Sequence, residues 1–222
     1  QYQRMRDLEL VLGALRLEGI PIEREEIEKV QEQMQGAAEQ STDETGTDQS
    51  SVLLGNFVLI SNCFYAIRFL QRQAKQGRGV SVDLLNELAS MIFSGTAGTE
   101  NMNRKSDTIY GLGSSVAVCP AGQLPQIMEE LKSTGLVNDD SLKGWNDLNP
   151  VRQSMSLLYQ YVSLSPFDYF SMVIGALWCA DPLLLAGFPA VGPKEAQMLQ
   201  IESFFQNPQD GQAYEQSICE EL

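Results

Sequence analysis

The sequence predicts a mainly α-helical domain with one small β element. Apolar residues recur at helical spacing in most segments, and β character is confined to one of them. A hydrophobic content of 43% over 222 residues is sufficient for the core of one compact domain. The chain contains no histidine, which excludes His-based catalytic triads, His-ligated metal sites and imidazole general bases.

Two helices are expected at the N-terminal end. Residues 3–18 carry leucines at helical spacing and end at Gly19, a typical helix stop. Pro21 is expected to begin a second helix over residues 21–35, whose acidic first turn suits the helix dipole. Residues 36–51 contain almost no large apolar side chain and predict a solvated loop.

The middle of the chain predicts two further helices and a hairpin. Residues 52–75 form an amphipathic stretch that the glycines of 77–79 interrupt. Ser81 is expected to cap the next helix. Thr108 to Pro120 has β character around a central Gly-Leu-Gly-Ser and predicts a short hairpin.

The C-terminal part is expected to be helical again. Helices are predicted from Pro125, over about 150–163 and 170–180, and over 193–205, with Asp181 as an N-cap. The chain therefore divides into N-terminal helices (1–35), a polar loop (36–51), a helical core (52–205) and an acidic tail (206–222).

Composition limits the classes of partner. A net charge of −14 argues against binding nucleic acid and against attraction to an anionic membrane surface. The most apolar stretch, residues 172–189, is interrupted by Asp181 and Pro182 and is too short to cross a membrane. The four cysteines form no CxxC pair and are interpreted as packing residues. The polar first residues lack a signal segment, so we expect a cytoplasmic protein; the sequence indicates no oligomeric state.

Four segments, taken in order, resemble the Fic/Doc (Fido) family of nucleotide-dependent transferases. They are LRLEGIPIEREEIEKV at 15–30, the helices containing 56–66 and 79–89, the stretch 104–131, and LNPVRQSMSLLYQYVSLSPFDYFSMVIGALWCADPLLLAGFP at 148–189. The last aligns without a gap, from SPF to AGFP, with the family pattern that contains HPFx[D/E]GNGRxxR. The resemblance implies a Fic-like helical domain with a small β-hairpin flap.

The resemblance also implies that the catalytic motif is lost. Ser165 stands where the family has its general-base histidine, Tyr169 where it has the Mg²⁺-binding carboxylate, and Val173 and Ala176 where it has two phosphate-binding arginines. Asp168 lies one residue early; a cap for the helix near Tyr169 is its simpler interpretation. No catalytic residue, metal or cofactor is therefore expected.

The phosphate-binding backbone and the inhibitory segment differ from the family as well. Phe170-Ser171-Met172 replaces Gly-Asn-Gly, whose glycines permit a phosphate-binding turn, so we expect packed helix there. Glu18 matches the family's inhibitory glutamate, but its partner in the family is the second arginine, here Ala176. We therefore expect Glu18 to be solvated beside Gly19.

The flap region is the first candidate for a contact surface. Arg104 could bind an anion, although an ion pair with Asp107 is the simpler interpretation, and Thr108, Ile109 and Tyr110 could meet a partner chain by strand addition. The aromatic residues between Tyr159 and Phe170 are interpreted as core.

These observations favour a catalytically inactive Fic-like protein that acts by protein–protein binding. The alternative is a Fido-fold transferase that uses a nucleotide or nucleotide-sugar donor, and it predicts a polar pocket near Arg104, Asp168 and Ser165. An unrelated helical interaction domain is a third possibility.

Overall fold

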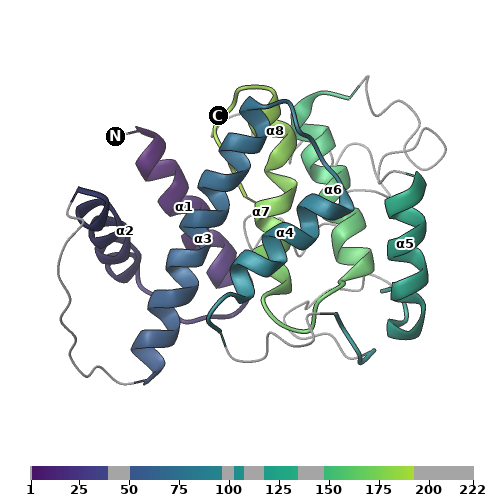
Figure 1. Ribbon diagram of the computed structural model, residues 1–222, viewed down its shortest axis with the longest axis horizontal. Helices are drawn as coiled ribbons and strands as arrows, with labels where there is room; N and C mark the ends of the chain where they lie inside the picture. The colour runs from purple at the N-terminus through teal and green to yellow at the C-terminus, as the bar shows by residue number, and fades with distance from the viewer. Residues whose placement is uncertain (1, 40–50, 97–102, 108–117, 135–147, 193–222) are drawn as a thin grey trace, which may run out of the picture.

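A computed structural model describes residues 2–39, 51–96, 103–107, 118–134 and 148–192 (Figure 1). Most of the expected hairpin, together with the predicted last helix and the acidic tail, lies outside the described residues. The part that is described is mainly helical, and the β pairing within it is an isolated antiparallel bridge between Asn103 and Phe167.

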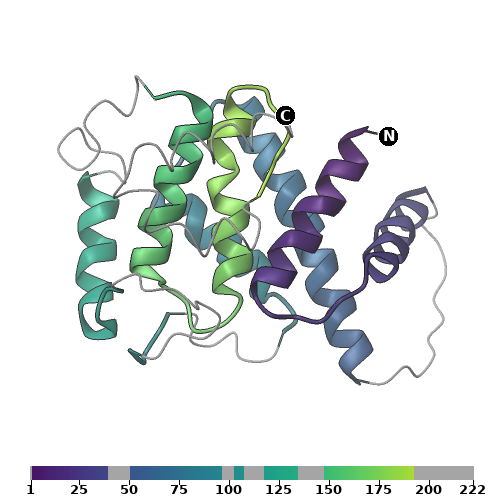
Figure 2. The same ribbon diagram turned by 180° about the vertical axis from the view of Figure 1, so that it is seen from behind.

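Helix α7 (Ser171–Cys179) lies at the centre of the molecule. It lies between α1 (Tyr2–Leu17) and α6 (Pro150–Leu164), while α3 (Ser51–Lys75) and α4 (Val82–Phe93) form a second layer (Figures 1 and 2). All nine residues of α7 are buried. Its sequence, SMVIGALWC, is apolar around the whole circumference, which is the pattern of a helix covered on every side.

The remaining helices complete the two ends of the molecule. Helix α2 (Arg24–Glu39) lies at one end and α5 (Leu124–Thr134) at the other (Figures 1 and 2). The short helix α8 (Asp181–Leu185) follows α7 and packs against α6 and α3. Within the described residues, no helix combines the length and the apolar composition that crossing a bilayer requires.

The expected stop of the first helix is confirmed. Gly19 adopts a φ of 78°, and the Ile20 N–H donates to the Leu15 carbonyl at 3.0 Å, which closes the last turn of α1. A residue with a Cβ is strained at this φ, so glycine suits the position. The turn leaves Glu18 at the C-terminal end of α1, where the side chain can reach a neighbouring helix.

The boundaries of α2 differ from those predicted. The helix begins at Arg24 and not at Pro21, because the Glu26 carboxylate accepts a hydrogen bond from the Glu23 N–H at 3.3 Å and so satisfies a donor at the helix start. It continues to Glu39, so the loop predicted from residue 36 was placed too early. Alanine and glutamate at 37–39 are good helix formers despite the missing apolar side chains.

The cap predicted at Ser81 is confirmed, and two of the four cysteines are buried as expected. The Ser81 hydroxyl accepts from the Leu84 N–H at 3.0 Å at the start of α4, and Asn149 caps α6 in the same way. Cys63 and Cys179 are buried, and burial raises the pKa of each thiol to about 12, so both act as packing residues.

Candidate functional site

The turn between α6 and α7 is the segment that resembles the Fic motif. It runs from Ser165 to Phe170, and both of these residues have left-handed backbone conformations, with φ values of 40° and 52°. The packed helix predicted at Phe170-Ser171-Met172 is present at Ser171 and Met172, which are buried in α7, whereas Phe170 precedes the helix as its left-handed N-cap. Packing supports the unusual φ of Phe170, because its ring lies 5.7 Å from that of Phe93.

The N-terminus of α7 holds a carboxylate from a distant part of the chain. Glu18 Oε2 accepts a hydrogen bond from the Met172 N–H at 2.8 Å. Phe170, the N-cap residue of α7, provides no side-chain hydrogen bond of its own. Glu18 therefore supplies the anion that the free N–H groups and the dipole of a helix N-terminus favour. The expectation that Glu18 is solvated without a partner was wrong, because its partner is backbone and not an arginine.

Two opposing effects act on the pKa of Glu18. Burial of the carboxylate raises the pKa, and hydrogen bonds from the backbone N–H groups of residues 170–173 lower it. Burial has the larger effect, so the pKa lies above its ordinary value. Burial has thus removed much of the contact between this carboxylate and water.

Tyr161 connects the start of α7 to α6. Its hydroxyl donates to the Ser171 carbonyl at 2.6 Å and lies 3.0 Å from the Ser171 Oγ. The pKa of Tyr161 is raised mainly by burial, and the nearby Glu18 carboxylate contributes in the same direction. The same tyrosine ring lies against Gly175, where a Cβ would approach the ring to 2.5 Å. The position of α7 therefore depends on an aromatic ring and on a glycine.

The side chains at the positions that align with the Fic motif do not form a reactive group. Ser165 is 1% exposed, and its Oγ is buried without a hydrogen-bond partner among the described residues. Tyr169 is 62% exposed and points away from the core, unlike its buried neighbour Phe167. Val173 and Ala176 are completely buried inside α7. No base and no phosphate-binding cation stands at these positions.

Asp168 does not cap α7. Its Oδ2 lies 3.4 Å from the Lys105 N–H, in the strand-like segment that pairs with Phe167. The helix begins three residues later, at Ser171, so the cap predicted for Asp168 was wrong. Asp181 is not an N-cap either: α8 begins at this residue, and both carboxylate oxygens are buried without a partner among the described residues.

Arg104 is a structural residue and not an anion-binding one. It is 4% exposed, and its guanidinium donates to carbonyl oxygens at the end of α6 and in the adjoining loops, namely those of Ser165 at 2.8 Å, Ser106 at 2.7 Å, Leu164 at 3.3 Å and Cys119. Its Nη1 also lies 3.9 Å from the Asp107 carboxylate. A guanidinium has five N–H groups, so these partners use nearly all of its donors.

The ion pair with Asp107, favoured over an anion contact for Arg104, is thus accompanied by a structural role. The predicted ion pair between Arg104 and Asp107 is present. The predicted partner-contact residues Thr108, Ile109 and Tyr110 lie outside the described residues.

A cavity of about 270 Å³ lies beside this region, between α4, α5 and the 103–104 segment. Arg104 and Pro166 contribute to its wall, together with Val82, Leu124 and Met128. Neither Ser165 nor Asp168 lines it. The cavity therefore differs from the polar pocket that an altered transferase predicts around those residues. In the described part of the chain, no three carboxylate or cysteine side chains are grouped as a metal site would need.

Comparison with solved structures identifies the fold. A Fic domain-containing signaling protein from Bacteroides thetaiotaomicron superposes with a TM-score of 0.62, over 91% of this chain and 71% of that one, at 18% sequence identity. The chain therefore has a Fic fold, as the four segments implied. No protein-family profile matches the sequence, and no curated protein matches it.

Sequence reasoning missed the contact that organises the site. It expected no partner for Glu18, because the arginine that pairs with this glutamate in the family is Ala176 here, and so did not consider the backbone of residues 170–173. The apolar composition of α7 could have indicated that its N-terminus would be buried and would need a partner from elsewhere.

Proposed function

We propose that this protein is a Fic-fold protein without nucleotide-transfer activity, which acts by binding another protein. The observation that carries the proposal is the Glu18 carboxylate at the N-terminus of α7. In the Fic motif that this segment resembles, the same backbone would hold phosphate. Here the chain fills the position with its own anion, and a nucleotide phosphate would have to displace it against charge repulsion.

The surrounding side chains support the same conclusion. The transfer reaction needs a general base near the attacking hydroxyl. The residue at the position of the base is Ser165, which is buried and has an alcohol in place of an imidazole. Phosphate transfer also needs cations, and Arg104 is bonded to carbonyl groups. A protein that has the Fic fold without these catalytic groups can still act by binding another protein through its surface.

The test is a transfer assay on the whole chain. Purified protein is incubated with radiolabelled ATP, GTP and UDP-sugars, with Mg²⁺ and with Mn²⁺, and with a cell extract as the source of targets. We expect no labelled protein, either from the wild type or from Glu18→Ala, because removing the carboxylate frees the helix N-terminus but creates no base. Label on any protein that depends on the added chain would contradict the proposal.

Nucleotide binding separates this proposal from the alternative transferase. We expect no shift in thermal unfolding with any member of the same nucleotide panel. Glu18→Ala is tested against the same panel, and Glu23→Ala, which removes an exposed carboxylate elsewhere, is its matched control. A shift that appears with one donor in the wild type would favour a transferase with a nucleotide or nucleotide-sugar donor.

A further inference from the structure

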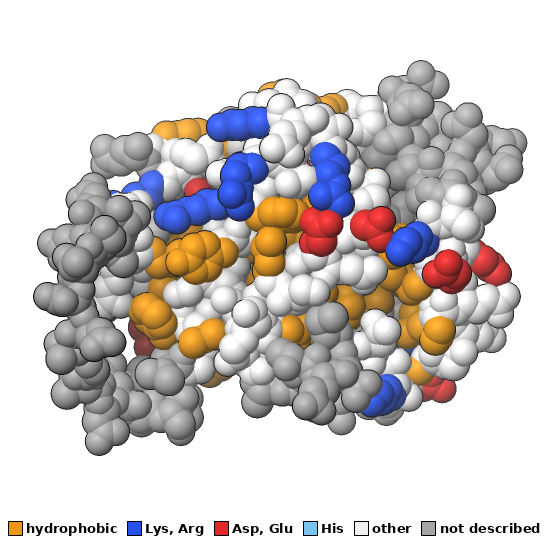
Figure 3. All heavy atoms as spheres, in the orientation of Figure 1, with side chains coloured by type: hydrophobic (Ala, Val, Ile, Leu, Met, Phe, Trp, Pro, Cys, Tyr) orange, Lys and Arg blue, Asp and Glu red, His pale blue; other side chains and the backbone are white. Residues whose placement is uncertain are grey.

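The outward face of α3 carries cations and aromatic rings together. We call this the α3 face and define it by five side chains that recur at helical spacing and are exposed or half-buried: Tyr65, Arg68, Phe69, Arg72 and Lys75. Figure 3 shows Lys and Arg side chains gathered over this helix, next to hydrophobic ones. Basic and aromatic groups on one helix face are typical of a surface that binds acidic, partly apolar ligands.

The charge of the α3 face is opposite to that of the chain as a whole. No Asp or Glu occurs between Asp48 and Asp83, whereas the whole sequence has a net charge of −14. Such a local reversal creates a positive region on an otherwise negative surface.

Two of the three cations on this face form no ion pair within the described part of the chain. Arg68 is close enough to Asp7 to influence the pKa of that carboxyl. Arg72 and Lys75 form no ion pair with the described residues, in contrast to Arg78 one turn further on, which contacts Glu87 at 2.8 Å. These two side chains are therefore available to a carboxylate from another molecule.

An open groove continues the surface toward α4. It has a volume of about 690 Å³ and is lined by Asn62, Tyr65 and Met91, among others. On the α4 side its lining includes two carboxylates, those of Asp83 and Glu87, which are paired with Lys132 and Arg78. Tyr65 forms one edge of the groove and is 56% exposed, which is unusual for a large aromatic side chain. An apolar side chain of a partner could lie against Tyr65 while its carboxylates meet Arg72 and Lys75.

We propose that the α3 face binds an acidic, amphipathic segment of a partner protein. The inference rests on the proposed binding function and names the chemistry of the partner. Nucleic acid is a poorer match, because its continuous phosphate charge would extend beyond the short positive region onto a negative surface. A second copy of the chain is also a poorer match, because arginines already contact two carboxylates of its acidic helix α2.

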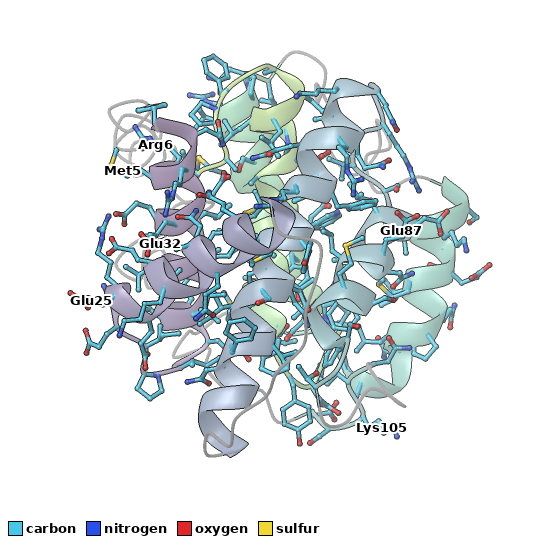
Figure 4. The ribbon with its side chains drawn as sticks, turned by 60° about the vertical axis from the view of Figure 1, so that its left-hand side comes forward. Met5, Arg6, Glu25, Glu32, Glu87 and Lys105 are labelled. Carbon is cyan, nitrogen blue, oxygen red and sulfur yellow. The ribbon has the colours of Figure 1, made fainter. Side chains whose placement is uncertain are left out.

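Figure 4 illustrates the acidic side of the molecule. Glu25 and Glu32 extend from α2 toward solvent, and Glu32 is paired with Arg4. Arg24 likewise contacts Glu28, at 3.0 Å. The acidic side is therefore interspersed with cations and does not offer the uniform charge that the α3 face would attract.

The experiment measures binding of a fluorescent peptide to the whole chain. The probe has about 16 residues, with Leu at helical spacing and Glu at the other positions; the matched peptide has Gln in place of Glu. We expect anisotropy to show binding of the Glu peptide alone, and we expect the affinity to fall as salt is raised. Arg72→Glu with Lys75→Glu should weaken binding by at least about tenfold.

A second double variant controls for net charge. Arg16→Glu with Lys29→Glu makes the same change of four charge units at exposed sites on α1 and α2, and it should stay within about twofold of the wild type. Tyr65→Ser should weaken binding without a change in net charge. The inference is overturned if the Glu peptide does not bind, if the Gln peptide binds equally, or if both double variants lose binding alike. Tighter binding of an oligonucleotide, or a dimer at low salt that the α3 variant abolishes, would overturn it as well.

The two proposals fail separately. Absence of peptide binding together with absence of nucleotide transfer removes only the α3 inference. Labelling by a nucleotide in a chain that still binds the peptide removes only the claim of inactivity.

Discussion

The Glu18 carboxylate accepts a hydrogen bond from the Met172 N–H at 2.8 Å, and this contact joins residues that are 154 positions apart in the chain. It fixes the C-terminal end of α1 to the N-terminal end of α7. The packing of these two helices along their length agrees with such a connection. The helix that begins in the segment resembling the Fic motif is thus capped by the segment that resembles the inhibitory element.

Removal of the Glu18 side chain should destabilise the fold. In Glu18→Ala the Met172 N–H loses its acceptor at a partly buried position, and an unsatisfied donor of this kind costs about 1–3 kcal/mol. Urea unfolding at pH 5 should show a decrease in the free energy of unfolding of this order. Glu18→Gln keeps an acceptor oxygen and should be clearly more stable than Glu18→Ala. Equal stability of the two variants would contradict the role of the hydrogen bond.

The pH dependence of Glu18→Gln follows from the raised pKa. Because the folded chain holds the proton of Glu18 more tightly than the unfolded chain, its contribution to stability is complete below pH 4.5 and is lost as pH rises through the raised pKa. Gln does not titrate, so the stability of the variant relative to wild type should increase from pH 4.5 toward neutral pH. Urea titrations at several pH values measure this difference, with Glu25→Gln, an exposed change, as the control.

Asp181 should make the protein less stable at neutral than at acid pH. Burial raises the pKa of this carboxyl from 3.8 to about 7, and its oxygens have no hydrogen-bond partner among the described residues. The stability that it contributes is therefore complete below pH 3.8 and is lost as pH rises toward 7. In Asp181→Asn, the fall in the free energy of unfolding between acid and neutral pH should be smaller than in the wild type by roughly 2–4 kcal/mol. An unchanged slope of stability against pH between 4 and 7.5 in the variant would show that Asp181 does not titrate in this way.

Arg104 should be one of the costliest residues to replace. Arg104→Met keeps much of the side-chain volume but leaves the carbonyl groups at the end of α6 without donors. Because hydrogen bonds to a charged group contribute about 1.5–3 kcal/mol each, we expect a loss of about 3 kcal/mol or more in the free energy of unfolding. Arg78→Met, which removes an exposed ion pair, should cost at most about 1 kcal/mol. Comparable losses in the two variants, measured by urea unfolding, would argue against the structural role.

Two glycine replacements should have opposite effects. Gly175→Ala places a Cβ 2.5 Å from the Tyr161 ring, and overpacking of this kind costs about 1–3 kcal/mol. Gly13→Ala lies in the middle of α1 with no atom within 4 Å of the new Cβ, so it should stabilise the fold by about 0.5–1 kcal/mol. Thermal unfolding of both variants measures the difference. A Gly175→Ala variant as stable as wild type would show that α6 and α7 can separate at this point.

Local sequence signals predicted most of the helices, but not every boundary. Ser81 and Gly19 act over one turn of backbone, so their capping and stopping roles can be recognised without knowledge of the fold. The predicted start of α2 was wrong because the hydrogen bond from the Glu23 N–H to the Glu26 carboxylate competes with the helix-start signal of Pro21. The cap predicted for Asp168 failed for a similar reason: its side chain meets the Lys105 backbone, which is distant in sequence.

The sequence by itself determined that imidazole chemistry is absent, that most of the chain is helical, and that the segment around Ser165 lacks the residues of the Fic motif. These are statements about which groups exist, and composition and order contain them. Only the tertiary structure decided that Glu18 contacts the N-terminus of α7 and that Phe170 adopts a left-handed backbone conformation without being glycine. It also decided that Arg104 donates hydrogen bonds to backbone carbonyl groups. The reason is physical: a buried polar group takes whichever partner packing brings near it, and no local pattern specifies a partner that is distant in the sequence.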